Sequence, residues 1–324
     1  MTDRPTRALI TGAAGQDGTY LTELLLSKGY EVWGVIGPEP GDYLSWAATQ
    51  GEDLHPCEAD LSDKDSLDRL IAEVVPDEVY NFAGISVVSM SWEHPVAVFD
   101  INATGVARLI ESLREYAPDA RLCQASSAEI FGHPAESPQT ETTPIRPVTP
   151  YGSSKAAAHF LVENAREGRG MFACNAILYN HESPRRPSSF VTAKIAEGAA
   201  RIKLGLASEL RLGNLDSARD WGYAGDYVEA MWLMLQADKP EDFVLATGVA
   251  HTVREFCDAA FSHVGLNWED YVIVDPEFFR PVDSQAPVGD ATKAREALGW
   301  EASKPFAAIV GEMVDGSPVR LAGE

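Results

Sequence analysis

RALITGAAGQDGTYLTELLLSKGYEVWGV, residues 7–35, is the stretch that decides the fold. An apolar run leads into a turn in which Gly12, Gly15 and Gly18 follow the spacing G-x-x-G-x-x-G, and a helical pattern and a second apolar run come after it. Glycines in such a turn let the backbone approach a pyrophosphate closely, and the free N–H groups at the start of the helix favour negative charge. The strand–turn–helix context therefore predicts a dinucleotide-binding unit.

The same alternation of strand and helix continues along the chain. Short apolar strands are expected at 78–84, 120–127 and 172–180, and helices at 66–76, at 96–118 and from Tyr151 onward. This order is typical of a doubly wound α/β fold with a mostly parallel sheet. We expect a dinucleotide-binding domain over 1–180, with a return segment at about 220–257 that adds a late strand at 242–248. The less regular segments 181–219 and 258–324 then form a smaller substrate-binding part.

Composition and charge narrow the classes of partner. The chain has 324 residues, is 45% hydrophobic and carries a net charge of −23, which repels nucleic acid and anionic membranes. No apolar run approaches the ~20 residues of a membrane-spanning helix, and the charged start of the chain does not resemble a secretory signal. Four scattered cysteines show no metal-ligand spacing, so no metal site is expected, and reduced thiols in a cytoplasmic protein are the expectation.

The end of the second strand predicts the cofactor. An acidic residue there binds the ribose hydroxyls of NAD, whereas arginine accommodates the 2′-phosphate of NADP. Between Gly34 and Ser45 there is no Arg or Lys, but Glu39 and Asp42 are present, which favours NAD. Asp60, after a further short strand, is either an adenine contact or simply an acid near a helix start.

Tyr151 and Lys155, in PYGSSKAAAH (150–159), lie four residues apart at the start of an Ala-rich run and so share one face of a helix. A tyrosine with a pKa near 10 is a poor base at neutral pH. A neighbouring ammonium and the positive charge of an oxidised nicotinamide would stabilise the phenolate. Lowering the pKa by ~3 units requires roughly 4 kcal/mol. An ordinary helix pair is the alternative, but the position after a nucleotide-binding half favours catalysis.

The strand before this helix ends in QASSAEIFG (124–132). Ser127 is placed to hydrogen-bond the substrate hydroxyl and orient it toward Tyr151. Glu129 offers a second base beside the same carbon skeleton, which an elimination requires. Their structural alternatives are a turn serine and an exposed acid at a strand end.

Several longer segments resemble the GDP-mannose 4,6-dehydratase family, which belongs to the extended short-chain dehydrogenase/reductases with a Rossmann fold. The similarity covers almost the whole chain. Its most specific pieces are Gln16-Asp17 inside the glycine turn, NHESPRR (180–186) and GNLDSARDWG (213–222). The resemblance implies a lyase that oxidises a nucleotide sugar at C4, removes the C5 proton with Glu129, eliminates water from C6 and returns hydride to C6. The product is a 4-keto-6-deoxy sugar nucleotide.

The resemblance also implies roles for further residues of this sequence. The catalytic residues are Ser127, Glu129, Tyr151 and Lys155; the serine stands where the family usually has threonine. The cofactor contacts are Gly12, Gly15, Gln16, Asp17, Gly18, Asp60, Leu61, Ala83, Gly84, Ser86, Lys155, His181 and Arg186. The substrate contacts are Ser86, Asn180, Val191, Lys194, Arg219, Arg280 and Asp283.

The sequence departs from the family pattern at three points. The family is typically NADP-dependent, with paired arginines after the second strand, where this chain has Gly37 and Pro38. The loop that follows these two positions is also short and altered, and in the family this loop helps to build a tetramer. We therefore expect a homodimer through helices near 96–115 and 151–168, with a tetramer as the alternative. Asp283 replaces a glutamate at a ribose-binding position, which leaves the nucleobase open.

Two other functions compete with the dehydratase. A 4-epimerase or 4-keto reductase would use the same scaffold but has no elimination step and no need for Glu129. A catalytically silent NAD-binding regulator would not need the set formed by Ser127, Tyr151 and Lys155.

Overall fold

Seven parallel strands form the central sheet, in the order β10-β6-β5-β4-β1-β2-β3. The structure, a computed structural model, describes residues 4–37, 41–279 and 288–317. The strands of this sheet are β1 (Arg7–Thr11), β2 (Glu31–Ile36), β3 (Leu54–Glu58), β4 (Glu78–Asn81), β5 (Arg121–Ala125), β6 (Ala173–Leu178) and β10 (Phe243–Leu245). The order reverses between β1 and β4, so the predicted doubly wound fold is confirmed, as is the late strand that pairs with β6.

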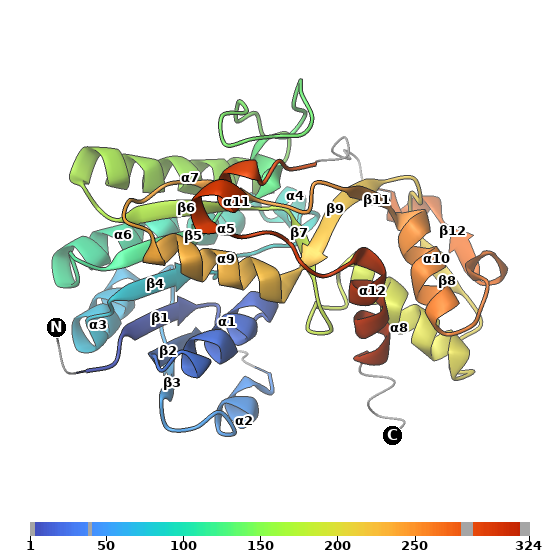
Figure 1. Cartoon of the computed structure of the whole chain (residues 1–324), viewed down its shortest axis with the longest axis horizontal. Coiled ribbons are helices and arrows are strands. Elements are labelled where there is room, and N and C mark those ends of the chain that lie inside the picture. Colours follow the sequence, from blue (N-terminus) through green and yellow to red (C-terminus); the bar gives the residue numbers. More distant parts are fainter. Residues whose placement is uncertain (1–3, 38–40, 280–287, 318–324) are drawn as a thin grey trace.

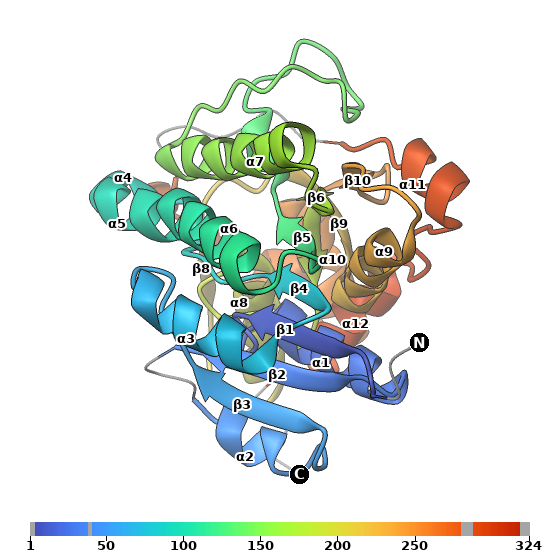
Figure 2. The same ribbon diagram turned by 90° about the vertical axis from the view of Figure 1, so that its left-hand side faces the viewer.

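Helices cover both faces of the sheet (Figures 1 and 2). On one face lie α1 (Gln16–Ser27), α2 (Tyr43–Ala47), α9 (Ala224–Gln236) and α11 (Thr292–Leu298). On the other lie α3 (Lys64–Val74), α6 (Gly105–Tyr116) and α7 (Pro150–Arg169). The inner strands β1, β4 and β6 are almost wholly buried on both faces, whereas the edge strand β3 is partly exposed.

The helix expected over 96–118 is not continuous. It consists of α5 (Pro95–Phe99), a π-helical turn (Asp100–Thr104) and α6, and a short helix α4 (Met90–Glu93) precedes it. The wider turn presents Asn102 to the loop after β4, where its side chain bonds both the N–H and the C=O of Ile85 at 2.8 and 3.0 Å. π-Turns of this kind often mark functional sites.

A smaller part with its own core packs beside the sheet, on the right of Figure 1. Its helices are α8 (Val191–Lys203), α10 (Val253–His263) and α12 (Phe306–Asp315). Two small sheets belong to this region: β11 (Ala250–Thr252), β9 (Ala218–Tyr223) and β7 (Asn180–Glu182), and β12 (Val272–Val274) with β8 (Leu210–Leu212). β7 follows β6 directly, so the smaller part begins at the carboxyl edge of the main sheet.

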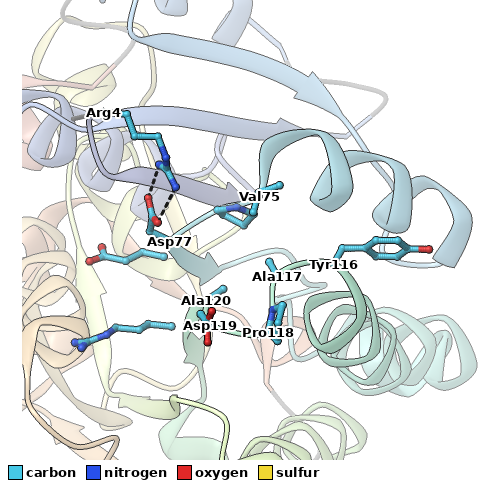
Figure 3. A pocket seen from close by; sticks show the side chains of 11 residues that line it. Arg4, Val75, Asp77, Tyr116, Ala117, Pro118, Asp119 and Ala120 are labelled. Carbon is cyan, nitrogen blue, oxygen red and sulfur yellow. Dashed lines mark hydrogen bonds and ion pairs between the residues drawn. The ribbon is translucent and has the colours of Figure 1, made fainter. Parts of the chain in front are cut away.

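A pocket of about 430 Å³ opens at the opposite edge of the sheet, at the amino ends of β4 and β5 (Figure 3). Two of its cations are already engaged, since Arg4 binds Asp77 and Arg121 donates to the carbonyls of Leu235 and Ala237. This pocket is remote from every residue that the sequence assigns to chemistry. Within the described residues, no helix is long and apolar enough to cross a lipid bilayer.

Candidate active site

The glycine turn between β1 and α1 has the close backbone packing that a pyrophosphate site needs. Gly12 has φ +71°, and a Cβ there would lie 2.8 Å from the backbone nitrogen of Ala83, while one on Gly18 would lie 2.5 Å from the Gly12 carbonyl oxygen. Gly15 caps α1 without a side-chain hydrogen bond. The first N–H groups of α1 therefore face a bare backbone surface, which fits a dinucleotide.

Replacing Gly12 with Ala tests this packing. We expect a loss of about 1–3 kcal/mol in the free energy of unfolding, because the new Cβ adds a clash to an unfavourable φ. Dinucleotide affinity should fall with it. Urea unfolding and calorimetric titration measure the two effects. Gly168→Ala in α7, where nothing lies within 4 Å of the new Cβ, should not destabilise the protein.

A buried chain of polar side chains crosses β1, β4 and β5 and ends at Lys155. Thr11 donates to Asn81, Asn81 donates to Gln124 (2.6 Å), and Gln124 donates to the Ala125 carbonyl (2.9 Å). Lys155 Nζ donates to the same carbonyl at 2.9 Å. These side chains are all nearly fully buried, so the chain fixes the ammonium group with little freedom.

Tyr151 sits in the first turn of α7, beside the segment that follows β5. Thr149 caps this helix by accepting from the Gly152 N–H (2.9 Å), and Pro150 occupies its first turn. A Cβ on Gly152 would lie 2.6 Å from the Glu129 carbonyl oxygen, so glycine is what allows the helix to approach. The Ser127 hydroxyl accepts from the Glu129 N–H at 3.2 Å. The structure thus brings Ser127, Glu129 and Tyr151 together.

Burial controls the acidity of this group. It raises the pKa of Tyr151 to about 12, against the opposing effect of a hydrogen bond with Ser127, and it lowers the pKa of Lys155 to about 8. The expected lowering of the Tyr151 pKa by Lys155 is not seen in the protein alone. Desolvation dominates there, and the ammonium lies 6.0 Å from the ring centre.

His181 and Asp17 form an ion pair beside the glycine turn. His181 Nε2 lies 2.9 Å from Asp17 Oδ2, and His181 Nδ1 lies 2.7 Å from the Tyr179 carbonyl oxygen. Gln16 completes the connection, because it donates to the His181 carbonyl (3.1 Å) and accepts from the Ser183 hydroxyl (2.7 Å). These contacts tie the start of α1 to β7 and hence to the smaller part.

Arg186 is held next to this pair. Its Nε lies 3.2 Å from the buried Glu182 carboxylate, and its guanidinium stacks on Phe190 at 3.7 Å. Burial raises the pKa of Glu182, and the charge of Arg186 opposes that rise. The positive charge of Arg186 also opposes the rise in the pKa of Tyr151 that burial causes. It therefore contributes positive charge to the same site.

The other residues assigned to the cofactor lie on neighbouring loops. Ala83, Gly84 and Ser86 follow β4, and a Cβ on Gly84 would lie 2.9 Å from Asn102 Oδ1. Leu61 is buried after β3. The Asp60 carboxylate accepts from the Ser62 N–H at 2.8 Å, which keeps its pKa below the ordinary value. The N-cap of α3 is Asp63, so Asp60 is not the acid that caps this helix.

The described residues assigned to the substrate lie in the smaller part, apart from Ser86. Asn180 is on β7, Arg219 is buried on β9, and Val191 begins α8. The Lys194 ammonium lies 3.9 Å from the Phe278 ring centre, and burial lowers its pKa. Arg280, Asp283, Pro38 and Glu39 lie outside the described residues. Across the described part of the chain, no cluster of His, Cys, Asp and Glu is arranged to hold a metal ion.

Two positions that sequence reasoning missed shape the site. Asn102 bonds the loop after β4 and also Ser154 on α7 (3.2 Å), and Gly152 allows α7 to pack against the Ser127–Glu129 segment. Asn102 gives no sequence signal, because the π-turn appears only in the structure. The order Thr-Pro-Tyr-Gly at residues 149–152 indicates the start of a helix, but it does not reveal that Gly152 lies close to the Glu129 backbone.

Comparisons with known proteins show which proteins the chain resembles. Residues 9–313 match the family model for GDP-mannose 4,6 dehydratase. GDP-mannose 4,6 dehydratase 2 from Arabidopsis thaliana is 50% identical over 320 residues, covering 95% of this chain and 86% of that protein. The Homo sapiens GDP-mannose 4,6 dehydratase is 42% identical over 334 residues, covering 95% and 90%. Among solved structures, the Thermus thermophilus UDP-glucose 4-epimerase in complex with NAD aligns with a TM-score of 0.83 at 29% identity, covering 96% and 98%.

Proposed function

The chain belongs to the GDP-mannose 4,6-dehydratase family and is thus a nicotinamide-dependent hydro-lyase, and we propose that its substrate is GDP-mannose, converted to the 4-keto-6-deoxy derivative. The oxidised nicotinamide, when bound, accepts hydride from C4 and the reduced ring returns it to C6. Every other role belongs to side chains of this protein. We propose that the glycine turn, with Gly12, Gly15 and Gly18, holds the pyrophosphate.

Tyr151 is the proposed base for the C4 hydroxyl. Ser127 hydrogen-bonds both the phenol and the incoming hydroxyl, and Lys155 and Arg186 supply positive charge close to the developing phenolate. Because the pKa of Tyr151 is about 12 with these charges in place, the positive charge of a bound oxidised nicotinamide would have to lower it further for proton transfer near neutral pH.

Glu129 is the proposed base for the second step. The C4 ketone acidifies the proton on C5, the Glu129 carboxylate removes it, and hydroxide leaves C6 as water once a proton is supplied from the site. The carboxylate is regenerated when C5 is reprotonated. The balance is one water lost, with no net change in the redox state of the cofactor.

The observation that carries this proposal is the position of Glu129 beside Ser127 and Tyr151. The Glu129 N–H donates to the Ser127 hydroxyl at 3.2 Å, and the negative charge of the Glu129 carboxylate raises the pKa of Tyr151. An epimerase or a 4-keto reductase has no use for a base at C5. A silent binding protein would have no use for the polar chain that fixes Lys155.

The test is to supply the purified protein with hexoses linked to GDP, UDP, CDP or dTDP, each with NAD or NADP. We expect loss of one water from GDP-mannose by mass spectrometry, and the alkali-induced absorbance of a 4-keto sugar. We propose NAD as the preferred cofactor, since no Arg or Lys lies between Gly34 and Ser45. A faster reaction with NADP would contradict that choice, and C4 epimerisation without loss of water would contradict the dehydratase assignment.

Substrate binding is assigned to the smaller part. We propose that Arg219 and Lys194, with Arg280, supply the positive charge that a nucleoside diphosphate needs on a protein with a net charge of −23. Asn180, Val191, Ser86 and Asp283 are the remaining proposed contacts. The division into a dinucleotide-binding domain and a substrate-binding part stays a prediction.

We propose a homodimer through α5, α6 and α7. Exposed apolar side chains collect around α4, α5 and α7, where Val96 is 82% and Phe160 47% exposed. In light scattering after gel filtration, Phe160→Glu should give a monomer, whereas Leu206→Glu, exposed on the smaller part, should leave the dimer intact. An unchanged mass for the Phe160 variant would exclude this interface.

The free state of all four cysteines supports a proposed cytoplasmic location.

A further inference from the structure

The carboxylate of Asp17 lies beside the glycine turn, where the proposed function places the pyrophosphate of the cofactor. Asp17 lies in the first turn of α1, two residues after the Gly15 cap, and its side chain is only 20% exposed. The positive end of the helix dipole attracts both this carboxylate and a pyrophosphate. Two anions held this close repel each other strongly in a partly buried site, unless a cation compensates one of them.

His181 has the hydrogen-bonding geometry of a cation. Both of its ring nitrogens face acceptor oxygens: Nε2 faces the Asp17 carboxylate at 2.9 Å and Nδ1 faces the Tyr179 carbonyl at 2.7 Å. A neutral imidazole carries one N–H and could satisfy only one of them, whereas an imidazolium satisfies both. The ring is 7% exposed and stacks on Tyr227 at 4.8 Å, so it cannot turn away without breaking these contacts.

We propose that His181 is a positioning residue that acts through Asp17: as an imidazolium it neutralises the carboxylate, so that the start of α1 can accept the cofactor pyrophosphate. This assignment rests on the proposed function in one respect, the binding of a dinucleotide at the glycine turn. It differs from a direct contact between His181 and the cofactor, because both ring nitrogens are already used.

The surrounding charges are consistent with an ionised pair. Burial alone lowers the pKa of His181, but the Asp17 carboxylate more than offsets this and raises it, while Arg186 on the following segment opposes the rise. The pKa of Asp17 is lowered by His181 despite burial. The other groups facing the pair are Glu182 on β7, Lys155 and Tyr151 on α7, Tyr179 at the end of β6 and Tyr227 on α9.

The sign of the pH dependence follows from the raised pKa of His181. The imidazolium is present below that pKa and is lost as the pH rises through it, above the usual value of about 6.5. Asp17 then remains charged and loses its paired cation, while the Gln16 amide and the more distant charge of Arg186 remain. Affinity for the cofactor should therefore decrease on the alkaline side.

The experiment measures NAD affinity by calorimetric titration of protein freed of bound nucleotide, across this pH range. His181→Gln keeps a hydrogen-bond donor but removes the charge, and should weaken NAD binding about tenfold or more at pH near 6.5. Adding Asp17→Asn to that variant should restore affinity to within about threefold of wild type and abolish the pH dependence. His263→Gln is the matched control, since His263 forms a similar pair with Asp315 (3.0 Å) on the surface of the smaller part.

A second readout does not use the cofactor. The NMR titration of His181 should give a pKa above the ordinary value in wild type and a lower one in Asp17→Asn. Equal loss of affinity in the single and double variants, or a His181 that titrates at or below the ordinary value, would overturn the assignment. If wild type binds no dinucleotide, the proposed function fails and this role with it, whereas normal binding without rescue refutes the role alone.

Discussion

Tyr151→Phe should lower kcat for loss of water from GDP-mannose by about 10³-fold or more, since general base catalysis contributes about 10²–10⁴-fold. The variant removes one oxygen and keeps the ring, which is 8% exposed and packed in the first turn of α7. Glu129, the other base beside Ser127, is assigned to the C5 proton. Oxidation at C4 would therefore stop before elimination begins.

Folding and binding controls separate this loss from a structural effect. The free energy of unfolding should change by no more than about 1.5 kcal/mol, the usual net contribution of one hydrogen bond. Affinity for the dinucleotide should stay near that of wild type. Tyr116→Phe, at the opposite edge of the sheet, should keep full activity. A Tyr151 variant that retains a tenth of the wild-type rate would show that another group is the base.

Glu129→Gln should abolish elimination while leaving oxidation at C4 possible. The amide keeps the size of the side chain but cannot accept a proton, so kcat for loss of water should fall by about 10²–10⁴-fold. In deuterated water the wild-type product should carry deuterium at C5, and the variant should incorporate none. The ultraviolet absorbance of reduced nicotinamide should instead rise when substrate is added.

The matched control is Glu136→Gln, an exposed acid on the loop that follows the same segment. It should leave both the rate and the deuterium content unchanged. Because Glu129 raises the pKa of Tyr151, its neutralisation should also ease formation of the phenolate. Full dehydratase activity in Glu129→Gln would remove the argument that separates this protein from an epimerase.

Local patterns predicted most of the fold. The apolar strands and the glycine turn at 7–35 need only neighbouring residues to be recognised, and the structure confirms the parallel sheet they imply. The interruption at Asp100–Thr104 could not be read, because its sequence favours a continuous helix and the wider turn is fixed by bonds from Asn102 to Ile85. The pairing of β7 with β9 joins residues about 40 apart, which no local pattern reveals.

Some residues of the candidate site could likewise be predicted from local spacing, and others could not. Tyr151 and Lys155 are neighbours on one helix, and Ser127 and Glu129 on one turn, so spacing alone predicted them. The pair of Asp17 and His181 joins residues separated by 164 positions and depends on the register of β6 with the main sheet. The raised pKa of Tyr151 was also beyond the sequence, since it depends on how completely α7 and the 127–131 segment exclude water.

The polar chain from Thr11 to Lys155 limits how the protein can be recombined. Thr11 on β1 donates to Asn81 on β4, Asn81 donates to Gln124 on β5, and Gln124 and Lys155 both donate to the Ala125 carbonyl. A chimera that took its first strands from another nucleotide-binding protein would set a foreign side chain opposite Asn81. The defect would then appear at Lys155, the proposed catalytic lysine, away from the graft point, rather than at the junction itself.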